Sequence, residues 1–220
     1  MAIFSSAFFP PISYFLSLLE HKTQIEIEQH EHFVKQSYRN RCRLVGSNGL
    51  IQLTAPVQKK SKTKTKIKDI ELNYDENWRD QHLRSMTAAY QSSAFYQYIK
   101  SDIEHIYSKK HRFLFDFNQE IFQFLIQKMK LDLSFQLTET YQSNLDLSND
   151  FRMQIHPKKD TLAHLNLKPY FQVFNERQAF IPDLSALDLL CNLGQDSERY
   201  LLSCLSSETK TLTRFPFPKA

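Results

Sequence analysis

The sequence predicts a mixed α/β fold, with α+β as the alternative class. Three observations support this: a strand-helix-strand pattern at the N-terminus, a hairpin signal at Asn48-Gly49, and helical periodicity through the middle of the chain. Of the 220 residues, 41% are hydrophobic, which is enough for one domain with a sizeable core. We therefore expect a single domain over residues 1–205 and a flexible C-terminal tail over residues 206–220.

The N-terminal residues predict a β-loop-α-β unit. Residues 3–9 are compatible with a short strand that Pro10-Pro11 would end. The segment "ISYFLSLLEH" has apolar residues at helical spacing. Residues 23–34 alternate as a half-buried strand does, with Ile25 and Ile27 on the apolar side. The polar side of this strand would carry Glu26, Glu28, His30 and His32.

A β-hairpin is predicted next along the chain. Asn48-Gly49 between two alternating runs is typical of a two-residue type I′ turn, which would pair Arg43 with Thr54. Arg41 and Arg43 would then project from one face. The opposite, apolar face would contain Cys42, as a buried structural thiol, with Leu44, Ile51, Leu53 and Ala55.

The remaining residues predict a helical middle section and a C-terminal strand-helix unit. After a lysine-rich loop at residues 59–68 and a strand over 67–73, we expect helices over 75–90, 93–107 and 118–130, the last capped by Asn118. Strands are expected over 133–139 and 169–174, with an irregular segment over 142–168 between them. Two final helices are expected over 182–194, with Ser185 and Asp188 as a capping box and Gly194 after its last turn, and over 196–205.

The composition excludes several classes of function. The chain has three glycines and contains neither G-x-G-x-x-G nor G-x-x-x-x-G-K-[ST], which argues against a standard dinucleotide site and a P-loop. Three cysteines without a C-x-x-C motif argue against a disulfide framework and a zinc ribbon, and they favour a reducing compartment. The apolar N-terminus has no basic region and no stretch is long enough for a membrane span, so we expect a cytoplasmic protein.

Four sequence blocks, in order, resemble the WbqC-like family over most of the chain. They are "FFPPISYFLSLLE", "FVKQSYRNRCRL…NG…L…PV", "W…HLRSMTAAY…FY" and "YFQVF…FIPDLSALDLL". The chain departs from the family pattern in four places. Ser13 stands where a glycine is usual, Asp183 where an asparagine is usual, and Gln29-His30 where many members have an acidic pair. The start, "SSAFFP", also lacks the glutamine that frequently precedes the aromatic-proline segment.

The resemblance implies a role in building O-antigen or another bacterial surface polysaccharide. It suggests a group transferase, with aminoacyl or glycyl transfer onto a sugar as one possibility, and association with other polysaccharide-assembly enzymes. It implies no particular cofactor, and none is identified from the residues. A non-catalytic protein that binds a sugar or nucleotide sugar, or that acts as a scaffold, is the alternative.

The leading candidate site consists of Arg41 and Arg43 with Lys35 and Asn40. Two guanidinium groups on one strand face lie about 7 Å apart and suit a diphosphate or carboxylate. Lys35 would add a positive charge, and Asn40 would bind a ligand hydroxyl or orient an arginine. The alternative is a charged, solvated hairpin face, which is the usual reason for such a run of charges.

Further candidates lie on other elements. On the helix over 75–90, His82 is the best available general base, and Trp78 shares its face. The alternative is a core-facing helix with a hydrogen-bonded histidine, which the pattern favours for Trp78. Tyr14, Tyr170 and Gln172 are candidates to contact substrate. No metal is expected, although Glu28, His30 and His32 would lie together on one strand face. Nucleic-acid binding through the lysine-rich run is a second alternative, and the lack of interleaved aromatic residues argues against it.

Overall fold

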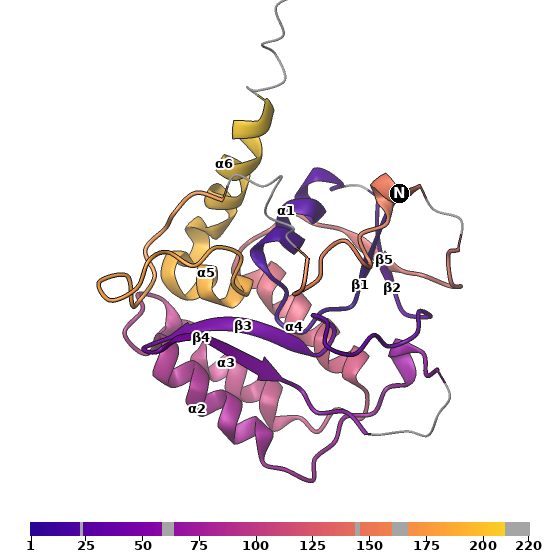
Figure 1. The fold of residues 1–220 in the computed structure, drawn as a ribbon, viewed down its shortest axis with the longest axis horizontal. Coiled ribbons are helices and arrows are strands. Elements are labelled where there is room, and N and C mark those ends of the chain that lie inside the picture. Colours follow the sequence, from indigo (N-terminus) through magenta and orange to yellow (C-terminus); the bar gives the residue numbers. More distant parts are fainter. Residues whose placement is uncertain (23, 59–63, 144–145, 160–166, 210–220) are drawn as a thin grey trace, which may run out of the picture.

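The computed structural model describes residues 1–22, 24–58, 64–143, 146–159 and 167–209 (Figure 1). They form a three-stranded parallel sheet, a two-stranded antiparallel hairpin and surrounding helices, so the predicted mixed α/β class is confirmed. No helix in these ranges is both long enough and apolar enough to cross a bilayer. Residues 59–63 of the lysine-rich run lie outside the described residues.

The parallel sheet is built from the predicted N-terminal unit and one later strand. Strand β1 (Ala2–Ser5), helix α1 (Ile12–Glu20) and strand β2 (Ile25–Glu28) follow one another, and β5 (Phe135–Leu137) pairs with the other edge of β2. All three strands are parallel, so their carboxyl ends lie at the same edge of the sheet. This shared edge is where open α/β sheets commonly bind ligands.

Two of the predicted strands in this unit are too long. The first strand ends at Ser5 rather than residue 9, and the second ends at Glu28 rather than residue 34. Glu31 explains the second difference, because it lies at a position of apolar parity and turns inward to a buried partner, Arg39. Glu28 is also fully buried rather than on a solvated face.

The hairpin consists of β3 (Arg41–Gly46) and β4 (Gly49–Thr54). The predicted register is wrong by two residues, because Ser47 and Asn48 form the turn and Arg43 pairs with Gln52. Gly49, at a φ of 107°, occupies the left-handed position after the turn that a side chain would disfavour. A shift of two preserves parity, so Arg41 and Arg43 still share a face, while Cys42 and Leu44 are buried on the other.

Three consecutive helices form the middle section, as predicted. They are α2 (Trp78–Tyr90), α3 (Tyr96–Ser108) and α4 (Leu114–Lys128). Helix α4 begins at Leu114, so Asn118 is not its cap; instead the Asn118 side-chain amide is buried and donates to Ser6 Oγ and to the Arg39 carbonyl. The strand predicted over 67–73 is absent, and a short 3₁₀ helix, η1 (Ile67–Asp69), lies there.

The C-terminal section is mainly helical. A 3₁₀ turn, η2 (Leu147–Asn149), precedes α5 (Ala186–Leu193), η4 (Gly194–Asp196) and α6 (Ser197–Thr209). The predicted strand over 169–174 does not form; the Gln172 side-chain amide instead bonds both backbone groups of Ile181. Helix α6 continues to Thr209, and the rest of the expected tail lies outside the described residues.

The hairpin is held between helices. Helices α2 and α5 both pack against β3, and Figure 1 shows β3 between the α2–α3 layer and the α5–α6 pair. Helix α5 begins as predicted, with Ser185 Oγ accepting the Leu187 N–H. The predicted capping box is incomplete, because the Asp188 carboxylate accepts from Tyr170 and Gln172 rather than from the helix N-terminus.

The end of α5 provides a test of this packing. Gly194 has a φ of 57°, and an added Cβ would lie 2.5 Å from Phe95 Cδ1. We expect Gly194→Ala to lower the free energy of unfolding by about 2–4 kcal/mol, from backbone strain and steric overlap together. Urea titration followed by circular dichroism measures the loss.

Gly49→Ala is the matched control, since Gly49 also has positive φ but its added Cβ would meet nothing nearer than Gln178 Oε1 at 3.9 Å. The strain is then present without the overlap, and we expect a loss of about 1 kcal/mol. Equal losses in the two variants would contradict the packing of Gly194 against Phe95.

Candidate functional site

Buried charges gather at the carboxyl edge of the parallel sheet. Glu28, the last residue of β2, accepts hydrogen bonds from the His30 N–H at 2.7 Å and from Thr138 Oγ1 at 2.9 Å. Its other carboxylate oxygen pairs with Arg152 Nη1 at 3.2 Å. Arg152 also pairs with Asp150. These groups satisfy one another, as buried charges require.

A second buried ion pair lies beside the first. Arg39 Nε donates to Glu31 Oε1 at 2.7 Å, and Arg39 Nη2 donates to Glu31 Oε2, which gives a bidentate pair. Arg39 is 1% exposed, so its charge is fully removed from solvent. Arg39 Nη2 also donates to the Arg152 carbonyl at 3.2 Å, which joins the two pairs.

Residues 150–159, which we call the strap, run from the sheet to the hairpin. At one end, Asp150 bridges to Ile3 of β1, and Phe151 stacks on Phe4 with ring centroids 4.7 Å apart. Towards the other end, the Pro157 carbonyl accepts a hydrogen bond from Arg43 Nη2. The strap therefore brings Pro157 and its neighbours, His156 and Lys158, beside Arg43 on β3.

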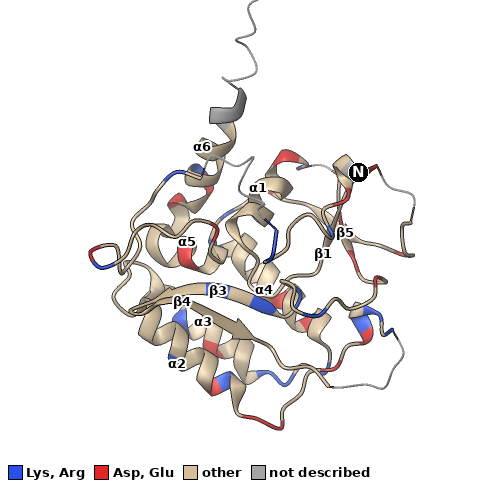
Figure 2. Ribbon diagram, in the orientation of Figure 1, with Lys and Arg blue, Asp and Glu red and all other residues tan. Residues whose placement is uncertain are grey.

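Arg41 and Arg43 lie on one face of β3, as predicted, and both are partly exposed. Figure 2 marks lysine and arginine positions in blue, including those on β3. The Arg43 guanidinium lies 5.9 Å from the centre of the Tyr38 ring, a cation–π contact that helps to orient it. Arg41 Nε is buried and makes no hydrogen bond to any described residue. Within the described part of the chain, neither guanidinium group forms an ion pair with a carboxylate.

One acidic group, Asp183, lies within electrostatic range of Arg43. Burial raises the pKa of Asp183 to about 6, and hydrogen bonds from Ser13 together with the charge of Arg43 oppose this rise. Asp183 Oδ1 accepts the Ser13 N–H at 2.7 Å, and Oδ2 accepts from Ser13 Oγ at 3.0 Å. Both carboxylate oxygens are thus engaged by the first turn of α1.

The other members of the predicted arginine site are placed differently. Lys35 is exposed on a turn. Asn40 is buried, and its Nδ2 donates to the Ala55 carbonyl at 3.0 Å, so it fixes the start of the hairpin. Asn40 Oδ1 is buried and accepts no hydrogen bond from any described residue. The structure therefore brings Arg41 and Arg43 together and gives Asn40 a supporting place.

The predicted base and two aromatic candidates lie in the core. His82 is 5% exposed, packs against Phe8 and Trp78, and its Nδ1 lies 3.1 Å from the Tyr107 hydroxyl. Burial lowers the pKa of His82 to about 4. Trp78 Nε1 donates to the Asn73 carbonyl, and the Tyr14 hydroxyl donates to the Ser5 carbonyl. We therefore leave these three residues out of the proposed site.

Tyr170 and Gln172 precede α5 and form a separate polar cluster with Asp188 of that helix. The Tyr170 hydroxyl donates to Asp188 Oδ2, and Gln172 Nε2 lies 3.3 Å from the same oxygen. Asp188 Oδ1 and the nearby Tyr90 hydroxyl are buried and make no hydrogen bond of normal geometry. Tyr170 and Gln172 thus hold the segment before α5 in place, and no contact links them to Arg41 or Arg43.

The weak metal candidates do not form a ligand set. Glu28 is fully used by Arg152, Thr138 and the His30 N–H. His30 Nε2 lies 3.1 Å from the Thr138 carbonyl, and His32 is exposed. Within the described ranges, no three His, Cys, Asp or Glu side chains are arranged to bind a metal ion.

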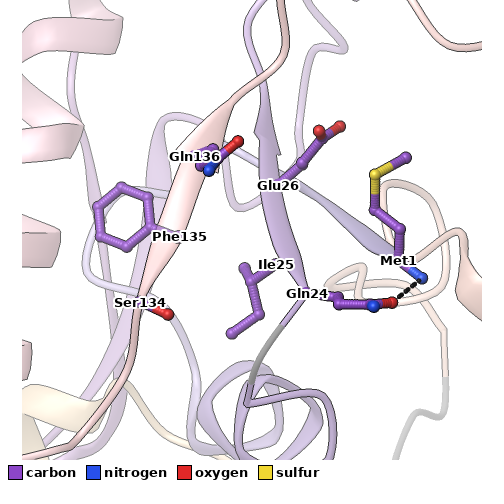
Figure 3. A pocket seen from close by; sticks show the side chains of 7 residues that line it. All are labelled: Met1, Gln24, Ile25, Glu26, Ser134, Phe135 and Gln136. Atoms are coloured by element: carbon purple, nitrogen blue, oxygen red, sulfur yellow. Dashed lines mark hydrogen bonds between the residues drawn. The ribbon is translucent and has the colours of Figure 1, made fainter.

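A pocket of about 420 Å³ lies at the opposite, amino-terminal end of β2 and β5 (Figure 3). Its walls carry Glu26 and Gln136, which face each other across the two strands, and the Met1 ammonium group, which bonds Gln24 Oε1 at 3.0 Å. The Glu26 carboxylate would repel an anionic ligand, and the Met1 ammonium group is already bonded to Gln24. We therefore place the candidate site at Arg41 and Arg43 rather than in this pocket.

Several residues around the site were not singled out from the sequence. Glu31, Arg39, Asp150 and Arg152 form the supporting ion pairs, and His156 and Lys158 lie on the strap. Arg39 offered no signal of this role, because it has the same strand parity as Arg41 and Arg43. The strap residues offered none either, since their pairing depends on contacts more than 100 positions apart, as between Arg39 and Arg152, which are separated by 113 positions.

The buried ion pair provides a stability test. Glu31→Gln would leave the charge of Arg39 buried without its partner, so we expect a loss of about 3–5 kcal/mol in the free energy of unfolding. Glu71→Gln is the control, since its partner Arg112 is 75% exposed and we expect a loss of about 1 kcal/mol or less. Urea unfolding measures both. Similar small losses would show that Arg39 is solvated.

Asp188 provides a pH test of the α5 cluster. Burial raises the pKa of Asp188 from 3.8 to about 6, so the folded state binds a proton more tightly than the unfolded state. Stability from this group therefore falls as pH rises from about 4 to 6, by about 3 kcal/mol, and is constant above.

Asp188→Asn should remove this part of the pH dependence of stability. The control is Asp132→Asn, at an exposed position, which should leave that dependence unchanged. Unfolding free energies measured between pH 4 and 7 decide the matter. An unchanged slope in Asp188→Asn would contradict the burial of the carboxylate.

Comparison with known proteins gives one positive result. The model of the WbqC-like protein family matches residues 5–167, which include α1, β2, the hairpin, the middle helices, β5 and the strap. The resemblance seen in "YFQVF…FIPDLSALDLL" lies beyond the matched residues. No curated protein and no solved structure matches the chain. Because the family model covers well over half of the sequence, the chain belongs to the WbqC-like protein family.

Proposed function

We propose that this protein is a group transferase of surface-polysaccharide assembly that binds an anionic, sugar-linked substrate through Arg41 and Arg43. The role in polysaccharide assembly follows from what the family resemblance implies. The binding site follows from the geometry of β3. Aminoacyl or glycyl transfer onto the sugar is the reaction that the resemblance favours.

The observation that carries the proposal is the contrast between paired and unpaired arginines. Arg39 and Arg152 are neutralised by buried carboxylates. Arg41 and Arg43, two and four positions after Arg39, have no carboxylate at ion-pair distance among the described residues. The carboxylate of Asp183, which feels the charge of Arg43, is held by Ser13 instead.

Partial burial distinguishes this arrangement from a solvated charged face. A fully exposed arginine obtains its hydrogen bonds from water, whereas Arg41 Nε is shielded from solvent and has no hydrogen-bond partner among the described residues. An unsatisfied buried donor costs about 1–3 kcal/mol. A phosphate or carboxylate that accepted from this group would recover that cost, so the alternative of simple solvation explains the geometry less well.

A diphosphate fits the spacing of the two guanidinium groups. Side chains two residues apart on a strand lie on one face with their Cα atoms about 7 Å apart. Each guanidinium can make two parallel bonds to phosphate oxygens. The absence of a glycine-rich phosphate loop from the sequence leaves side chains to provide this binding.

A non-catalytic sugar- or nucleotide-sugar-binding role is the second candidate, and one observation favours it. His82, the base expected from the sequence, is packed among Phe8, Trp78 and Tyr107 and does not face the arginine pair. Binding is therefore better supported than chemistry. Prolonged incubation with a nucleotide sugar and an aminoacyl donor, followed by mass spectrometry, separates the two roles, because only the transferase changes the sugar.

Calorimetric titration with pyrophosphate and with a nucleotide diphosphate sugar tests the binding site. We expect the double variant Arg41→Ala/Arg43→Ala to bind at least about 100-fold more weakly than the native chain, because two charge-assisted interactions are lost.

The control is Arg84→Ala/Arg199→Ala, which removes the same charge from exposed positions on α2 and α6. This control should bind normally. Unchanged affinity in Arg41→Ala/Arg43→Ala, with the fold intact by circular dichroism, would contradict the proposal. Equally weakened binding in both double variants would show that affinity depends on the net charge of the protein and not on Arg41 and Arg43 in particular.

A further inference from the structure

The arginine face of β3 has a second basic surface beside it. The strap reaches Arg43 through the hydrogen bond from Arg43 Nη2 to the Pro157 carbonyl. The residues on either side of Pro157 are His156, which is partly buried, and Lys158, which is exposed. Both are therefore brought next to Arg43 by a direct bond rather than by a loose surface contact.

The strap is anchored firmly enough to act as a wall. Three separate contacts hold it: the Phe151 N–H donates to the Ile3 carbonyl at 2.8 Å, Arg152 pairs with Glu28 and Asp150, and the Arg152 carbonyl accepts from Arg39. All of these anchors precede residue 153. The part of the strap next to Arg43 is thus positioned by a buried network that does not itself use His156 or Lys158.

The orientation of His156 is also defined. Its Nδ1 accepts the Lys158 N–H at 3.2 Å, which places the imidazole proton on Nε2 in the neutral ring. Nε2 can then donate to an anion, and Lys158 adds an exposed ammonium group two residues further along the strap. The strap thus offers two further donors in addition to the guanidinium groups of β3.

We propose that the strap forms the second wall of the anion site, with His156 and Lys158 binding the same diphosphate or carboxylate groups as Arg43. This inference rests on the anion site proposed above. It adds residues that the arginine motif does not contain, and it places the ligand between β3 and the strap rather than on the open face of the hairpin.

The electrostatics of His156 agree with this arrangement. Partial burial lowers the pKa of His156, and the charges of four neighbours lower it further: Arg39, Lys158, Lys159 and Arg43. A bound anion among these cations would favour the imidazolium form, so the pKa of His156 should rise when the site is filled.

The test combines binding and proton NMR of the native chain. With pyrophosphate as the probe, we expect Lys158→Ala to weaken binding about tenfold, which corresponds to one charge-assisted bond. Lys100→Ala, which removes the same charge from α3, is the control. The Cε1–H resonance of His156, assigned from its absence in His156→Gln, should show a pKa higher by about 1 with saturating pyrophosphate.

Tenfold weakening in Lys158→Ala with a raised His156 pKa supports the second wall. Binding that depends on Arg41 and Arg43 but is unaffected by Lys158→Ala, with the His156 pKa unchanged, overturns this inference and leaves the proposed function standing. No binding of pyrophosphate or nucleotide diphosphate sugar to the native chain overturns both.

Discussion

The structure depends on one buried ion pair, the bidentate contact between Arg39 and Glu31. It ends β2, because Glu31 must turn inward, and it fixes the chain just before β3 begins at Arg41. The same guanidinium holds the strap through the Arg152 carbonyl, and the Arg39 carbonyl accepts from Asn118 of α4. Sheet, strap, hairpin and helical layer therefore meet at one residue. Since a buried charge is stable only with its partner, these four parts are constrained together.

A second contact ties the two ends of the described chain. Ser13 and Asp183, two of the positions where the chain departs from the usual family pattern, are 170 positions apart and touch: the Ser13 N–H and hydroxyl both donate to the Asp183 carboxylate. The carboxylate supplies an acceptor to the first turn of α1, where backbone N–H groups have none. The hydrogen bonds from Ser13 also engage the carboxylate whose pKa the charge of Arg43 lowers. The two departures thus form one interaction, and it leaves the cation of Arg43 available to a ligand.

Local patterns predicted the fold well and the site in part. The β-loop-α-β unit, the hairpin and helices α2 to α6 follow from periodicity. The shared face of Arg41 and Arg43 was predicted correctly despite the wrong turn assignment, because a two-residue shift keeps strand parity. Asn118 and the segment at 169–174 were misread for a different reason. Their polar side chains bond distant backbone groups, at Arg39 and Ile181, and local sequence does not encode such partners. The strap is the extreme case, because nothing in "DFRMQIHPKK" indicates that it will lie against β1 and β3.

Together these contacts neutralise the buried arginines, and among the described residues they leave Arg41 and Arg43 without a carboxylate partner. A crystal structure of the native protein with bound pyrophosphate would test whether an anion takes that place. We expect the anion between β3 and the strap, with its oxygens within hydrogen-bond distance of the Arg41 and Arg43 guanidinium groups. Pyrophosphate bound elsewhere, with Arg41 and Arg43 turned to solvent, would contradict it.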